Sequence, residues 1–132
     1  MKHCIIAKYT AEAYARWEAL LPRIREIFAV AGEIPGVRGA EVYPNCVARE
    51  NRYDVMIVLE MDRDALPLYD DSEMHHRWKD EFGGLLEKKA IFDYEGETHP
   101  SGDVFLLSIL KKAPHRLRRV LTGEGRIIGR AG

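Results

Sequence analysis

Apolar and polar residues alternate along this chain in two rhythms, one typical of strands and the other of helices. Four runs have strand character, being short, apolar and partly β-branched or aromatic: residues 3–9, 37–43, 53–61 and 88–95. The third run alternates most regularly, since every second residue is apolar: Tyr53, Val55, Ile57, Leu59 and Met61. We therefore predict four strands.

Between these runs the apolar residues recur at spacings of three and four, which predicts helices. Thr10 can cap the first helix, and the apolar face of that helix comprises Tyr14, Trp17, Leu21, Ile24 and Phe28. Pro22 lies inside this run and removes one backbone hydrogen bond, so we expect a kink or a break there.

Two helical segments precede the last strand. Asp62 can cap a short one that reaches Tyr69, and Ser72 can cap a longer one that starts at Glu73. The apolar stripe of the longer helix comprises Met74, Trp78, Phe82 and Leu85. His76 lies about 100° from His75 around this helix, so we expect it to face solvent.

The order of elements is β-α-β-β-α-β, which predicts a ferredoxin-like α+β fold with an antiparallel sheet and both helices on one face. The other face of this sheet carries apolar residues that no helix of the chain covers. A monomer would expose them to water. We therefore expect a homodimer that packs sheet against sheet.

Charge divides the chain at a Gly/Pro/Ser-rich stretch near residue 97. Residues 1–96 carry 13 Lys and Arg against 18 Asp and Glu, whereas residues 97–132 carry 7 against 3. We predict one domain over 1–96 and a basic, partly helical extension over 97–132. Such an extension could bind a membrane or an acidic partner, but we favour a helix docked on the acidic domain or a loose tail.

Overall composition narrows the possible partners. The net charge of −1 argues against a nucleic-acid partner, and no apolar run is long enough to span a membrane. Cys4 and Cys46 are too few for a disulfide framework. With no signal peptide at the start of this sequence, we expect a cytoplasmic protein.

Several segments, in their order and spacing, resemble the stress-responsive A/B barrel (Dabb) family. They are Lys2–Ile6, Ile34–Gly39, Arg52–Met56, the Tyr69, His75 and Trp78 spacing, and Ile91–Tyr94. The resemblance covers about residues 2–95 and implies a dimeric α+β barrel. Many members of the family have no known activity, and others are stress-induced proteins that form oligomers.

One branch of plant cyclases within this family closes linear polyketones by an aldol-type condensation, using a His and a Tyr. The resemblance places Tyr69 and His75 on that catalytic pair and His3 on a cavity-lining histidine. The cyclase has a further histidine on the third strand, where this chain has Asp54 or Val55. The family often has His-Pro before the catalytic histidine, where this chain has Ser72-Glu73.

The residues themselves support the same candidates. His75 would be third in its helix, where the positive helix end disfavours a charged imidazole, so it suits a general base. Tyr69 could hold a substrate oxygen as negative charge develops on it. The alternatives are a structural histidine bonded to a loop carbonyl and an ordinary packed tyrosine. His3 could line the same pocket or be a satisfied core residue.

The expected substrate-binding residues around this pair are His3, Trp17, Phe28 and Trp78. We expect no metal, because the spacing of Asp70, Asp71, His75 and His76 matches no standard zinc pattern, and no cofactor. Neither cysteine has a basic neighbour that would activate a thiolate.

Two functions remain open at this point. One is a binding protein or cyclase-like enzyme that acts on a carbonyl compound through His75 and Tyr69. The other is a non-catalytic stress or assembly protein. A cavity that reaches His75 favours the first, and a cleft filled by Trp17, Phe28 and Trp78 favours the second.

Overall fold

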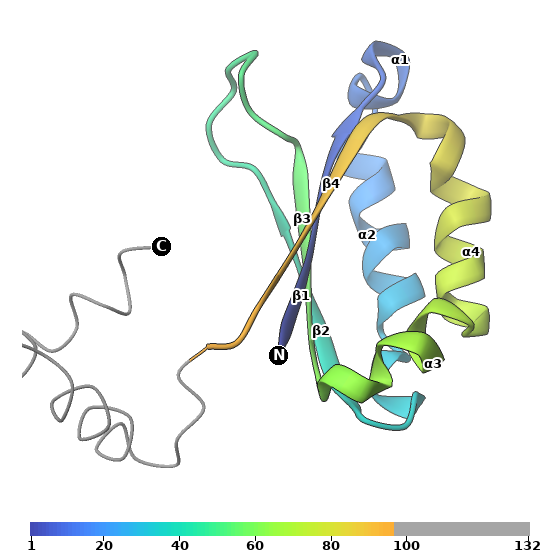
Figure 1. The fold of residues 1–132 in the computed structure, drawn as a ribbon. Coiled ribbons are helices and arrows are strands. Elements are labelled where there is room, and N and C mark those ends of the chain that lie inside the picture. The colour runs from blue at the N-terminus through green and yellow to red at the C-terminus, as the bar shows by residue number, and fades with distance from the viewer. Residues whose placement is uncertain (97–132) are drawn as a thin grey trace, which may run out of the picture. The chain divides into compact units, whose positions relative to one another are not determined.

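The computed structural model describes residues 1–96, and the predicted extension over 97–132 lies outside these residues. Four antiparallel strands form one sheet in the order β2-β3-β1-β4. The strands are β1 (Lys2–Tyr9), β2 (Val37–Pro44), β3 (Val55–Met61) and β4 (Leu86–Tyr94). Helices α2 (Trp17–Phe28) and α4 (Glu73–Phe82) cover one face of the sheet (Figure 1). The predicted β-α-β-β-α-β order is confirmed.

Short helical segments connect these elements. They are α1 (Ala11–Tyr14), η1 (Ala31–Glu33), η2 (Arg63–Ala65), α3 (Leu66–Asp70) and η3 (Gly83–Leu85). Gly36, with φ of +84°, turns the chain between η1 and β2. A Cβ at this position would lie 2.7 Å from the Cβ of Ala65. The close approach of this turn to η2 therefore requires glycine.

The prediction of a break at Pro22 is wrong. The first helical run divides at Ala15 and Arg16 instead, and α2 continues through Pro22. One proline removes a single backbone hydrogen bond, and buried residues on both sides of it, Leu20 and Ile24, anchor the helix. This early division also changes which residues of α2 face the core. They are Leu20, Ile24, Ile27 and Phe28.

Two of the three predicted helix caps are confirmed. The Thr10 hydroxyl accepts a hydrogen bond from the Ala13 amide, and the Ser72 hydroxyl accepts one from the His75 amide, both at 3.1 Å. Asp62 makes no such bond. Its carboxylate instead accepts a hydrogen bond from the Arg38 guanidinium at 2.9 Å, because β2 brings that cation beside it.

The strand limits differ from the predicted ones by one or two residues. β2 extends through Pro44, β3 begins at Val55, and β4 runs over Leu86–Tyr94. Leu85, which we expected on the stripe of the last helix, lies in η3 and packs against the core. The Gly83-Gly84 pair accounts for the early end of α4, since glycine has low helix propensity.

Alternation along β1 and β3 separates the two faces of the sheet. The helix-covered face holds the core residues Ile5, Ala7, Tyr9, Val55, Ile57, Leu59 and Met61. The opposite face carries an apolar surface, which we call the open face: Cys4, Ile6, Tyr43, Met56, Val58, Ala90, Phe92 and Tyr94. Phe92 is 62% exposed, and Tyr43, Met56 and Tyr94 are also exposed. Within residues 1–96 no helix covers this apolar face, as predicted from the sequence.

Candidate functional site

Four side chains from four elements meet between the helices and the edge of the sheet. They are His3 of β1, Tyr69 of α3, His75 of α4 and Asp93 of β4. The ring centroids of His3 and Tyr69 lie 5.2 Å apart. The centroids of Tyr69 and His75 lie 4.6 Å apart. The fold therefore brings the three predicted residues His3, Tyr69 and His75 together, with Tyr69 between two imidazoles.

His75 is held by the first turn of its helix. Its amide donates to the Ser72 hydroxyl, and its ring Nδ1 lies 2.9 Å from the carbonyl oxygen of Asp70. A carbonyl only accepts hydrogen bonds, so Nδ1 carries the proton. When the ring is neutral, its other nitrogen, Nε2, therefore has a free lone pair.

Burial lowers the pKa of His75 below its usual value of 6.5, and the nearby Lys79 and Lys89 ammonium groups lower it further. The hydrogen bond to the Asp70 carbonyl and the Asp70 carboxylate act in the opposite direction. The ring is consequently neutral at pH 7, as expected from the sequence. The leading cause is the loss of water around the ring, whereas the sequence predicts the same neutral state from the position of the ring at the helix end.

Tyr69 lies wholly inside the fold. Its side chain is 1% exposed, and its hydroxyl has no hydrogen-bond partner among the described residues. Burial, followed by the charge of Asp70, raises the pKa of this phenol well above its usual range. Tyr69 is therefore a neutral phenol at pH 7, with a proton that it can donate. A buried polar group without a partner is rare in folded proteins.

The partner of His3 is Asp93, which sequence reasoning did not select as a functional residue. His3 is buried, and its Nδ1 donates a hydrogen bond to Asp93 Oδ1. The two residues lie opposite each other in the β1–β4 register. Sequence reasoning could have found Asp93 by pairing the first predicted strand with the last, because that pairing places this acidic residue opposite His3.

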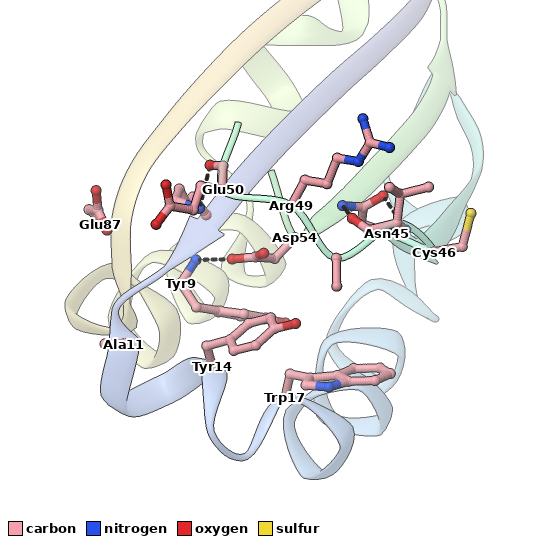
Figure 2. Close-up of a pocket in the computed structure, with 13 residues that line it drawn as sticks. Tyr9, Ala11, Tyr14, Trp17, Asn45, Cys46, Arg49, Glu50, Asp54 and Glu87 are labelled. Atoms are coloured by element: carbon pink, nitrogen blue, oxygen red, sulfur yellow. Dashed lines mark hydrogen bonds between the residues drawn. The ribbon is translucent and has the colours of Figure 1, made fainter. Parts of the chain in front are cut away.

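The other predicted binding residues lie elsewhere. Phe28 and Trp78 are buried in the core, with ring centroids 5.4 Å apart in an edge-to-face contact. Trp17 is half-buried and lines a pocket of about 750 Å³ at the opposite end of β1 (Figure 2). His76 is exposed, as expected, and its Nδ1 donates to the Ser72 carbonyl at 2.7 Å.

Other site chemistries find little support among residues 1–96. No group of three or more His, Cys, Asp or Glu side chains within these residues could hold a metal ion. Burial, with the charge of Asp93, raises the pKa of the Cys4 thiol, which disfavours a reactive thiolate. No helix in the described part of the chain is long and apolar enough to cross a membrane.

No family model matches the chain, and no curated protein sequence matches it. A dimeric protein of unknown function with a ferredoxin-like fold, from Bacteroides fragilis, matches with a TM-score of 0.61 and 20% identity. That match covers 71% of this chain and 93% of the other.

Two further solved structures are similar. The Arabidopsis thaliana protein At3g17210 matches with a TM-score of 0.56 and 21% identity, over 76% of this chain and 97% of that one. A dabb family protein with a ferredoxin-like fold, from Mesorhizobium loti, matches with a TM-score of 0.55 and 20% identity, over 71% and 93%. This chain therefore has the ferredoxin-like α+β fold, in the form that is found in a dabb family protein.

Proposed function

We propose that the cluster of His3, Tyr69, His75 and Asp93 binds a small carbonyl compound of polyketide type and performs acid–base chemistry on it. The observation that carries this proposal is the buried Tyr69 hydroxyl, which has no hydrogen-bond partner among residues 1–96 and lies beside the neutral ring of His75. Leaving such a hydroxyl unpaired costs about 1–3 kcal/mol. A ligand oxygen would supply the missing hydrogen bond.

His75 is the general base in this scheme. Its Nε2 takes a proton from the carbon next to a substrate carbonyl, and the electron pair of the broken C–H bond moves onto the carbonyl oxygen. The Tyr69 phenol donates a hydrogen bond to that oxygen as negative charge develops. The enolate carbon can then attack a second carbonyl carbon of the same molecule, and the proton on His75 passes to the new alkoxide.

His3 and Asp93 position the tyrosine. Asp93 holds the His3 ring by a hydrogen bond, and that ring meets the ring of Tyr69 nearly edge-on, at an interplanar angle of 62°. The Asp93 side chain is 37% exposed, and His75 is half-buried. A substrate would therefore approach along this edge of the sheet, past His75 and Asp93.

The test is proton exchange at carbon, which requires no knowledge of the final product. A panel of methyl ketones and 3-oxo esters is incubated with the protein in D₂O, and loss of the α-proton signal is followed by ¹H NMR. We expect faster exchange than in buffer for at least one compound, and none of this acceleration with His75→Ala. His76→Ala, one residue away and exposed, is the matched control and should behave as wild type.

The open face supports a second part of the proposal, that two copies of the chain pack sheet against sheet. Phe92 projects from this face at 62% exposure, and the half-buried Ile6 and Val58 continue the apolar surface. Burying a large apolar side chain contributes about 1.5–3 kcal/mol. The similar protein from Bacteroides fragilis is described as dimeric.

A non-catalytic binding or assembly role is the second candidate. It is favoured by Phe28 and Trp78, which are buried between the helices and the sheet with their rings in contact and so fill the space of a cleft. In that case Tyr69 and His75 are packing residues. Wild-type protein that accelerates exchange of no compound in the panel would favour this role.

A further inference from the structure

A pocket lies at the opposite end of β1 from the cluster of His3, Tyr69, His75 and Asp93. It has a volume of about 750 Å³ and is lined by residues of α1, by the start of α2, by the β2–β3 loop and by the end of β1 (Figure 2). His3 and Tyr9 mark the two ends of β1, six residues apart, which corresponds to roughly 20 Å along a strand. This volume is within the range of small-molecule sites.

One side of the pocket is aromatic. Tyr14 and Trp17 lie next to each other on the helical side, opposite Asn45 and Arg49 of the β2–β3 loop (Figure 2). Tyr14 is 43% exposed and Trp17 is half-buried. Part of the surface of each ring is therefore exposed and not packed against the protein core. Exposed aromatic faces attract flat rings and organic cations.

A carboxylate lies between the aromatic side and the loop. Asp54 Oδ2 accepts a hydrogen bond from the Tyr9 amide at 2.8 Å, which fixes the side chain. Its other oxygen, Oδ1, has no hydrogen bond within residues 1–96. Figure 2 shows this carboxylate above the rings of Tyr9 and Tyr14. Asp54 thus presents a positioned acceptor with a negative charge to the pocket.

The two cations of the lining are directed elsewhere. Lys8 Nζ donates to the carbonyl oxygens of Arg52 and Glu50, at 3.2 and 3.4 Å. The Arg49 guanidinium points away from Tyr14 and Trp17 (Figure 2). The carboxylates of Glu50 and Glu87 also line the pocket. Of the charged side chains labelled in Figure 2, Asp54 is therefore the one that lies beside the aromatic side.

We propose that this pocket is a second small-molecule site, which binds an organic cation of the arylalkylamine class. The ring of the ligand lies against Tyr14 and Trp17, and its ammonium group donates to Asp54 Oδ1. The site is independent of the acid–base cluster, so either can be correct without the other.

Three probes of similar size and different charge test this proposal. Phenethylamine is the cation, 2-phenylethanol the neutral compound and 3-phenylpropanoate the anion. Binding to the full chain is followed by ¹H–¹⁵N NMR, in which the indole N–H of Trp17 reports on the pocket and that of the buried Trp78 on the core. We expect saturable shifts at Trp17 with phenethylamine, and affinity at least about tenfold weaker for the other two.

Variants identify the residues responsible. Asp54→Asn keeps an oxygen acceptor for the Tyr9 amide but removes the charge, and should weaken phenethylamine binding about tenfold. Asp80→Asn removes an exposed charge on α4, outside the pocket lining, and should leave binding unchanged. Tyr14→Leu, at an exposed position, should also weaken binding. His75→Ala should have no effect, which separates this site from the acid–base cluster.

The proposal is overturned by any of three results. These are equal affinity for the three probes, shifts at Trp78 without shifts at Trp17, and unchanged binding in Asp54→Asn. The probe comparison uses wild-type protein only, so a poorly folded variant does not prevent the decision.

Discussion

The ring of His75 lies against the ring of Tyr69, with centroids 4.6 Å apart and an interplanar angle of 48°. The two residues come from different helices, and the Ser72 cap joins them. The Ser72 hydroxyl donates to the Tyr69 carbonyl at 2.7 Å and accepts from the His75 amide at 3.1 Å. One serine therefore fixes the base and the phenol relative to each other.

His75→Ala should reduce any carbonyl-directed activity by about 10²- to 10⁴-fold, the usual contribution of a positioned general base. His76→Ala should change activity less than twofold, because this ring is exposed and its Nδ1 bonds the Ser72 carbonyl rather than a group of the site. Initial rates on a compound identified by the exchange assay provide the measurement. Equal losses in the two variants would indicate that helix α4, rather than the His75 ring, is responsible.

Tyr69→Phe should raise stability and lower activity together. The substitution removes a buried hydroxyl that has no hydrogen-bond partner in the described part of the chain, so the free energy of unfolding should increase by about 1 kcal/mol. Activity should fall, though less than in His75→Ala, and ligand binding should be largely retained. Urea unfolding monitored by circular dichroism measures the stability. Tyr14→Phe, at an exposed position, should remain within about 0.5 kcal/mol of wild type. A clearly destabilised Tyr69→Phe would mean that the hydroxyl is bonded in solution.

The lowered pKa of His75 predicts a pH dependence of stability. Below pH 6.5 the unfolded chain binds a proton at His75 that the folded protein does not, because burial and the Lys79 and Lys89 charges oppose it. The free energy of unfolding should therefore rise as the pH increases toward 6.5 and show no further contribution from His75 above that value.

Urea unfolding of wild type, His75→Ala and His76→Ala between pH 5 and 8 separates this contribution from those of other groups. His75→Ala should lose part of the slope below pH 6.5, and His76→Ala should keep that part. NMR titration of the His75 ring gives its pKa directly. A value well above 7 would exclude the ring as a base.

Phe92→Asp should dissociate the proposed dimer. Light scattering of wild type should give about twice the chain mass of 15.1 kDa, and the variant should give the mass of one chain with an unchanged circular dichroism spectrum. Each copy loses about 1.5–3 kcal/mol of apolar burial, so the dissociation constant should rise at least about a hundredfold. Leu68→Asp, which changes an exposed leucine of α3 outside the open face, should remain dimeric. A wild-type monomer would contradict the proposal.

A chain that ends at Gly96 should fold and dimerise, because all four strands of the sheet lie within Lys2–Tyr94. If Val104, Leu107 and Leu110 dock on the domain, their loss should cost a few kcal/mol at most, the scale of burying two or three apolar side chains. Urea unfolding of the two chain lengths measures the difference. A truncated chain that fails to fold would place the domain boundary later than residue 96.

The helix and strand types followed from the sequence because their signals are local. Alternation of Val55, Ile57, Leu59 and Met61 defines a half-buried strand whatever it pairs with. The Thr10 and Ser72 caps act within their own helical turns. The prediction at Pro22 was wrong because the lost backbone hydrogen bond is a local effect, whereas the burial of Leu20 and Ile24 that opposes it depends on the rest of the fold.

Some residues of the candidate site could be identified only from the tertiary structure. The resemblance pointed to His3, Tyr69 and His75, but Asp93 emerged only when β4 was placed beside β1. The roles expected for Phe28, Trp78 and Trp17 illustrate the same limit. All three are aromatic residues at helical spacing, yet the first two are in the core and the third lines a pocket at the far end of β1.

The order of amino acids alone predicts which segments form strands and helices, in which order they follow, and which sheet face is apolar without a covering helix. These properties depend on residues a few positions apart. Two further properties follow from the folded arrangement alone: within residues 1–96 the Tyr69 hydroxyl has no hydrogen-bond partner, and burial is the main cause of the lowered His75 pKa. Both depend on which distant side chains exclude water from a group, and no spacing along the chain records that.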